Sequence, residues 1–247
     1  MDMTQILHAF LLAFRNLLHP KILWLFIWPL IAACLLWTGI SYFFWIPSAD
    51  WIREMISSTA ISNWLDEFYL EKAITGIEGF LNVVIFIMLV VVTTLVITAL
   101  FAMPALINFV AKRYFPQLDR QSGGTIMGSL VNVISATLVF IVLWGIALPF
   151  WFIGIGMIIS FVAAAYLNQR VFSYDALAEH ANPEELKTLL KTDKLMLWGL
   201  GLLTGVLQFV PILNFFAPTI TALAFIHFEL TRLKKLRAQS NQLPQIG

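Results

Sequence analysis

The sequence predicts an all-α integral membrane protein with two long spanning helices, two helical hairpins and an amphipathic N-terminal helix. Of its 247 residues, 60% are hydrophobic and 12% are charged, against about 45–50% and 25% in soluble domains. Uncharged runs of 25 to 49 residues exceed the roughly 20 that one helix needs to cross a bilayer. Prolines lie inside the longest runs and mark where the chain turns.

The segment 4–21 is predicted to be an interfacial helix. Its apolar residues recur at helical spacing, at Ile6, Phe10, Phe14 and Leu17. Such a helix lies along the membrane interface or packs on a neighbouring element.

Two uncharged runs, 22–46 and 79–111, are predicted to be the long spanning helices, the first kinked at Pro29. Between them, 47–78 carries six acids and two bases. We expect this segment to be a periplasmic excursion of short helices around 51–56 and 62–70.

The second half of the chain is predicted to form two hairpins. No charge occurs between Arg120 and Arg170, a stretch of 49 residues, so 125–169 must hold two helices that reverse at Pro149. The run 195–230 is too long for one span. We expect it to break within 211–218, leaving arms of 16 and 11 residues that enter the membrane and return. Whether either hairpin crosses fully or only part-way stays open.

The remaining segments are polar. We predict a cytoplasmic helix within 170–194, begun by Asn182 as its cap with Pro183 in the first helical position. The end of the chain, 231–247, is predicted to be a basic tail that is disordered after Arg237.

Charge predicts the orientation. Thirteen of the fifteen lysines and arginines lie before residue 22, at 112–120, at 170–194 or after 231. The predicted topology puts all thirteen on one side, so the positive-inside rule places both termini in the cytoplasm.

Several function classes are excluded by pattern. A net charge of +1 without a continuous basic face does not suit nucleic acid. The single cysteine and four widely spaced histidines give no metal site, no catalytic motif is recognisable, and we expect neither a cofactor nor enzymatic activity. The glycines at 199, 201 and 205 are typical of close helix packing.

Several segments, in order along nearly the whole chain, resemble one known family. They are Ala13-Phe-Arg-Asn-Leu-Leu-His-Pro20 before a Trp-Pro-Leu helix, Met103-Pro-Ala-Leu-Ile-Asn108, Tyr166 to Tyr174, Gly201-Leu-Leu-Thr-Gly205 and Pro211-Ile-Leu-Asn-Phe-Phe-Ala-Pro218. The family is the CysZ-type sulfate permeases, the bacterial branch of the etoposide-induced-protein domain family. Where its better-known members read like Pro-Gly-Leu-Arg-Arg before the first long helix, this chain has Pro20-Lys21-Ile22-Leu23-Trp24.

The resemblance implies two long spanning helices with hairpins that penetrate the inner membrane part-way, assembled as a homo-oligomer. It also implies uptake of sulfate or a similar small oxyanion. The alternative is a non-transporting membrane scaffold or interaction protein of the same family.

Two groups of residues are candidate sites. Arg15, His19 and Lys21 lie beside the predicted start of the first spanning helix, where cations and helix N–H groups together favour an anion. The alternative is that Arg15 and Lys21 are ordinary cytoplasmic anchors for lipid headgroups. The candidate pathway or hairpin-turn residues are Asn108, Pro211, Asn214 and Pro218, for which a purely structural turn is the alternative.

Overall fold

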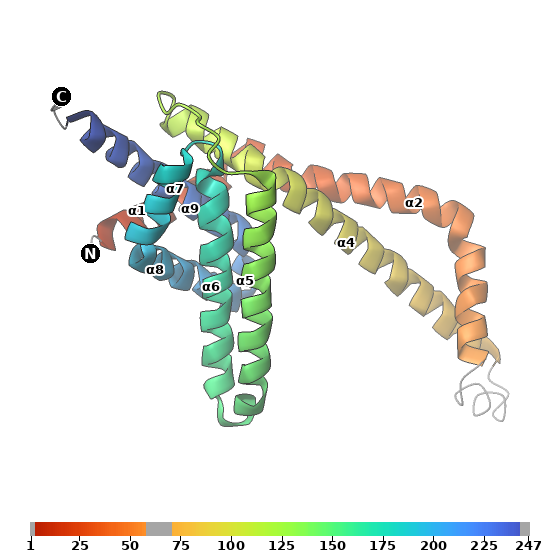
Figure 1. Ribbon diagram of the computed structural model, residues 1–247. Coiled ribbons are helices and arrows are strands. Elements are labelled where there is room, and N and C mark those ends of the chain that lie inside the picture. Colours follow the sequence, from red (N-terminus) through yellow and green to blue (C-terminus); the bar gives the residue numbers. More distant parts are fainter. Residues whose placement is uncertain (1–2, 58–70, 243–247) are drawn as a thin grey trace. The chain divides into compact units, whose positions relative to one another are not determined.

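The computed structural model describes residues 3–57 and 71–242, which are almost entirely helical and include no strand (Figure 1). This confirms the all-α class. The helices are α1 (Met3–Leu17), α2 (Pro20–Ser57), α4 (Glu71–Tyr114), α5 (Ile126–Ala147), η1 (Leu148–Ile153), α6 (Ile155–Ala178), α7 (Pro183–Thr192), α8 (Lys194–Gly205), η2 (Val206–Phe209) and α9 (Pro211–Gln242).

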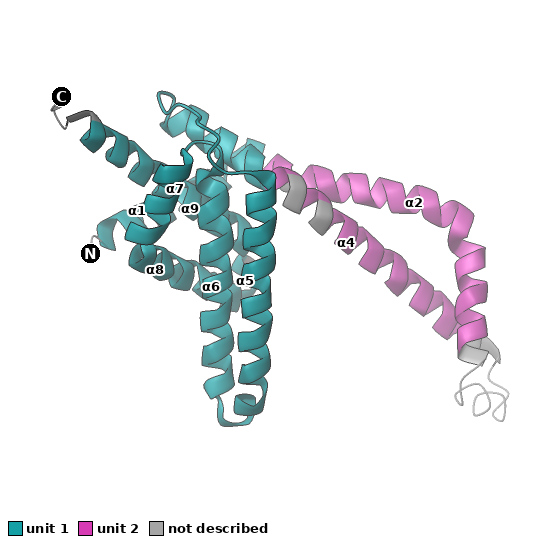
Figure 2. Ribbon diagram, viewed as in Figure 1, with its two compact units in different colours: residues 1–22, 103–247 teal, residues 23–102 magenta. Residues whose placement is uncertain are grey.

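The chain forms two compact units (Figure 2). Unit 1 comprises residues 1–22 and 103–247, and unit 2 comprises residues 23–102. The boundary runs through α2 and α4, so the first turn of α2 and the end of α4 belong to unit 1. Each unit is described by itself.

Helix α9 is the core of unit 1. Every residue from Thr219 to Leu230 is buried, and α1, α6 and α8 all pack against this helix. When protein covers an apolar helix on all sides, its side chains are shielded from water without any contact with lipid. The apolar stretch that the sequence assigned to a membrane-entering arm is therefore the protein core of this unit.

One polar cluster fixes α1 to this core. The Asn16 amide Nδ2 donates to His227 Nε2 at 2.7 Å, and its Oδ1 accepts from the Tyr114 hydroxyl at 2.8 Å. Asn16 and His227 are both buried. Because an unsatisfied buried amide is costly, the cluster specifies how α1, α9 and the end of α4 meet. The predicted interfacial helix thus packs on a neighbour along its buried face.

The predicted close packing at the glycines is confirmed. A Cβ added at Gly201 would lie 2.8 Å from the Ala165 carbonyl oxygen, and one at Gly205 would lie 2.9 Å from the Phe161 ring. Helices α8 and α6 therefore approach each other more closely than residues with side chains would permit.

Helices α5 and α6 form the hairpin that the sequence predicted. The chain reverses through η1 and Gly154, whose φ of 78° suits glycine. With 22 and 24 residues, α5 and α6 are about 33 and 36 Å long, which suffices for complete crossing of a core of roughly 30 Å. Their apolar side chains are largely exposed, as a lipid-facing hairpin requires.

Unit 2 is a pair of long helices, α2 and α4, joined by interhelical polar contacts. The Trp37 indole donates to Thr93 Oγ1 at 2.8 Å, and Asn82 Nδ2 donates to the Trp45 carbonyl at 3.1 Å. Near the end of α2 and the start of α4, Arg53 Nε lies 2.7 Å from Glu78 Oε1 in an ion pair. Polar groups in these apolar helices are thus satisfied by each other.

The segment 47–78 differs from its predicted form. Helix α2 continues without a break through Pro47 to Ser57, and α4 already begins at Glu71. The expected short helix at 51–56 is therefore the end of α2, while the other, 62–70, lies outside the described residues. Figure 1 shows that α2 bends, as helices with internal prolines do.

The last turn also differs from its predicted position. The chain leaves the helical conformation at Val210, which is extended, and α9 starts at Pro211 and runs through Pro218. Proline suits the first helical position because its missing N–H has no partner there in any helix. Helix α9 also continues past Arg237 to Gln242, where the sequence predicted disorder.

We predict that Gly201→Ala destabilises the protein by about 1–3 kcal/mol, because its Cβ would clash with the Ala165 carbonyl. Gly145→Ala on α5 is the matched control, since nothing lies within 4 Å of an added Cβ there. Thermal unfolding in detergent measures both. Equal melting temperatures for the two variants would contradict the close α6–α8 contact.

Candidate anion-binding sites

The three predicted cationic residues lie at the junction of α1 and α2 in unit 1. Arg15 and Lys21 are exposed, and neither forms an ion pair with a described residue. His19 lies between them in the sequence and packs against Phe109, with ring centroids 4.8 Å apart and the ring planes tilted by 60°. The junction therefore presents two free positive charges on either side of an anchored imidazole.

The first turn of α2 has few backbone donors left for an anion. Pro20 has no N–H, the Lys21 N–H donates to His19 Nδ1 at 3.2 Å, and the Ile22 N–H donates to the His19 carbonyl at 2.8 Å. His19 thus caps α2. An anion at this junction would be held by the side chains of Arg15 and Lys21.

The predicted turn residues are not brought together. Asn108 lies near the end of α4 and accepts a hydrogen bond from Arg120. Pro211, Asn214 and Pro218 all lie in the first turns of α9, where Asn214 is exposed and its N–H donates to the Val210 carbonyl. These three begin a helix, and their link to a pathway stays a prediction.

A basic pocket that the sequence did not indicate lies between α5, α6, α7 and α8. Its volume is about 570 Å³. Four bases line it, and none of its lining residues is acidic. The bases are Arg170, Lys187, Lys191 and Lys194, and the remaining lining residues are Asn132, Tyr166, Gln169, Tyr174, Leu186, Leu190 and Trp198.

Helical spacing directs these side chains to the pocket. Lys187 and Lys191 are four residues apart on α7, as are Lys194 and Trp198 on α8, so each pair shares one face of its helix. The i, i+4 lysine pair was a signal available in the sequence. Which partner helix that face meets was not.

The acids nearest to these bases are engaged elsewhere. Glu185 accepts from Arg237 at 2.8 Å, and Asp193 accepts from Arg232 at 2.6 and 2.7 Å. Because Arg237 and Arg232 pair with these two carboxylates, they do not neutralise the pocket.

Helix α9 carries a buried carboxyl close to Asp193. Glu229 is completely buried. Burial, and then the nearby Asp193 carboxylate, raise the pKa of Glu229 well above its usual value. Glu229 is not among the residues that line the basic pocket.

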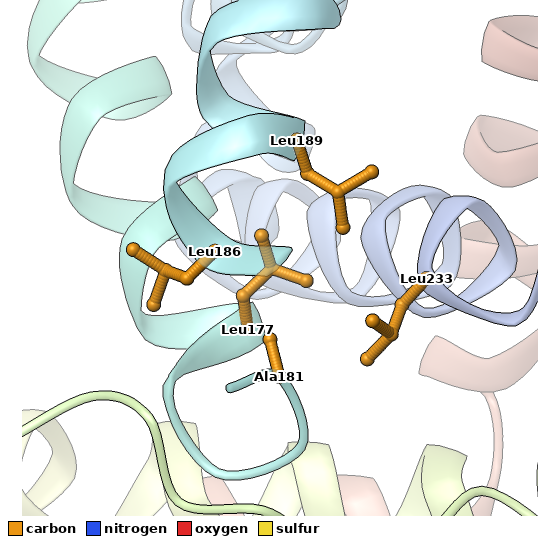
Figure 3. Close-up of a cluster of buried hydrophobic side chains, with 5 residues drawn as sticks. All are labelled: Leu177, Ala181, Leu186, Leu189 and Leu233. Carbon is orange, nitrogen blue, oxygen red and sulfur yellow. The ribbon is translucent and has the colours of Figure 1, made fainter. Parts of the chain in front are cut away.

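Two local features set the position of α7. Asn182 and Glu185 form a reciprocal capping box at its start, with both hydrogen bonds at 2.8 Å. Figure 3 shows the apolar contact that holds this helix on α6 and α9. The contact is made by Leu177, Ala181, Leu186, Leu189 and Leu233. The predicted cap at Asn182 and first-turn Pro183 are confirmed by this geometry.

Four helices in the described part are long and apolar enough to cross a membrane. They span 20–55, 75–94, 126–153 and 155–178. Helix α8 is only about 18 Å long with its 12 residues, and it falls short of a span. Of the bases in the pocket, Arg170 lies in the second half of the α6 span, and Lys187, Lys191 and Lys194 follow the end of that span along the chain, away from the tip of the hairpin.

Residues 9–218 match the family described as sulfate transporter CysZ/etoposide-induced protein 2.4. The chain belongs to this family. Its description is that of a transporter rather than an enzyme. No curated protein and no solved structure matches the chain.

We predict that acid weakens this fold through His180. Burial, and then the charges of Arg120 and Arg237, lower the pKa of this histidine to about 4 from 6.5. The unfolded chain binds this proton more readily, so the stability is complete above pH 6.5 and is lost as the pH falls towards 4. The loss is roughly 2–3 kcal/mol.

The variant His180→Gln cannot take up this proton. Melting temperatures measured from pH 7 to pH 4 should therefore fall less steeply for the variant than for the natural protein. Parallel curves would show that His180 is already protonated or is not buried.

Proposed function

We propose that this protein is a multi-pass permease of the inner membrane that passes a small oxyanion passively, with sulfate as the first candidate. The observation that carries the proposal is family membership over residues 9–218 in a chain with four helices of spanning length. A passive path is favoured because the uncharged runs 22–46, 79–111 and 121–169 contain no acid, base or histidine to bind and release a coupling proton.

Electrostatics favours an anion over a cation as the substrate. Arg15 and Lys21 are unneutralised at the α1–α2 junction, and we propose them, with His19 as a positioning group, as the first contact for the anion. Exposed bases raise the local concentration of anions at such a mouth.

We also propose that both termini are cytoplasmic and that several copies assemble to complete the pathway. The orientation rests on the position of thirteen of the fifteen bases at one set of span ends. Assembly is supported by the short α8, which cannot line a full crossing alone.

A non-transporting scaffold of the same family is the second candidate. The observation in its favour is the capping of α2 by His19, which occupies backbone donors that an anion site at this helix start would use.

Flux into proteoliposomes separates the two candidates. We expect sulfate to enter faster than into empty vesicles, and Lys21→Ala to slow entry roughly two- to fivefold through the loss of one attractive charge. Lys112→Ala is the matched control, because Lys112 is an exposed lysine at the end of α4. Thiosulfate and chloride should be compared in the same vesicles.

Folded, inserted protein that passes no anion above empty vesicles would favour the scaffold. Equal rates for Lys21→Ala and Lys112→Ala would remove the α1–α2 junction from the pathway while leaving the permease in place.

A further inference from the structure

The basic pocket is lined by the positively charged residues of a segment that contains both bases and acids. Residues 170–194 contain four bases and five acids. All four bases line the pocket and none of the acids does. The segment as a whole is slightly acidic, yet the fold directs its bases to the pocket and its acids elsewhere. The pocket is therefore suited to an anion.

The fold also keeps these bases from being neutralised. Asp193 lies directly before Lys194, yet both of its oxygens bind Arg232. Likewise Glu185 is two residues from Lys187 and binds Arg237. The bases that pair with these acids come from α9, so the four bases of the pocket form no ion pair within the described part of the chain.

The volume of the pocket exceeds what an inorganic oxyanion requires. A cavity of about 570 Å³ lies within the range of roughly 300–1,000 Å³ that holds drug-sized ligands. Its inner wall is partly aromatic, with the rings of Tyr166 and Trp198 5.9 Å apart. A larger ligand with an anionic group and a neutral polar or apolar part fits this lining better than a bare ion.

The rim of the pocket continues into apolar surface. Val131 and Leu195 are chain neighbours of the lining residues Asn132 and Lys194, and they are 59% and 67% exposed. Asn132 is in the first third of α5, at the end of the hairpin opposite its tip. Charge and exposed apolar side chains therefore meet where a spanning hairpin leaves the bilayer, at the depth of lipid headgroups.

We propose that the basic pocket binds the phosphate headgroup of an anionic phospholipid, whose acyl chains lie along the exposed apolar side chains of α5. The lysines act as flexible point charges on the phosphate, and Arg170 offers a planar set of donors. The tyrosine hydroxyls and Gln169 suit the neutral polar part of the headgroup. This site does not depend on transport of sulfate.

The test uses the full chain in uncharged detergent and compares phosphatidylglycerol with phosphatidylcholine of the same short acyl length, by calorimetric titration. Lys187→Gln combined with Lys191→Gln should weaken binding of phosphatidylglycerol about 30-fold. Lys112→Gln combined with Lys234→Gln is the matched control, because it removes two exposed lysines outside the pocket. The control should bind as the natural protein does.

Circular dichroism checks that both double variants are folded, and Arg170→Gln provides a second variant within the pocket. The proposal is overturned if the two lipids bind equally, or if pocket and control variants lose the same affinity. It is also overturned if sodium sulfate alone binds in a pocket-dependent way and phosphatidylglycerol does not, since the pocket would then serve a soluble anion.

Discussion

The ion pair between Asp193 and Arg232 determines how the charged half of unit 1 is built. Asp193 is completely buried and is the only residue between α7 and α8. Its N–H closes α7 on the Leu189 carbonyl and its carbonyl accepts from Leu197, while its side chain is held by Arg232 of α9. Such a pair costs several kcal/mol to desolvate and is stable only with full hydrogen bonding. It therefore fixes one arrangement of α7 and α8 rather than adding general stability.

The consequence for function lies in what this arrangement exposes. With Asp193 paired to Arg232 and Glu185 paired to Arg237, the bases of α7 and α8 line the pocket with no acid among its lining residues. The same geometry places them next to a hairpin of spanning length. A membrane protein of a sulfate transporter family thus carries two separate sets of unneutralised bases, one at the α1–α2 junction and one in the basic pocket.

Much of the fold could be predicted because long uncharged runs indicate membrane helices and prolines indicate where helices begin, bend or end. The α5–α6 hairpin and the Asn182 cap follow from local chemistry. The position of the last turn did not, because proline both breaks helices and begins them, and Pro211 begins one. Nor does composition distinguish a lipid-facing helix from one buried in protein, which is why α9 was taken for a membrane arm.

The candidate sites could likewise be predicted only in part from the sequence. Arg15, His19 and Lys21 lie at one junction because they are close in sequence, but the use of His19 as a cap depends on its rotamer and on Phe109. The basic pocket combines residues of four helices, and its charge depends on Arg232 and Arg237 removing two acids. The partners of these two ion pairs are 39 and 52 residues apart in the sequence, so no local sequence pattern indicates them.

The most direct measurement is a crystal structure of the protein grown with phosphatidylglycerol whose acyl chains carry bromine, with anomalous scattering from bromine locating the lipid. The account predicts a phosphate in the basic pocket, within hydrogen-bonding distance of Arg170 or Lys191, and bromine peaks along α5. A pocket without lipid in well-ordered crystals, or lysines paired there with Glu185 or Asp193, would contradict it.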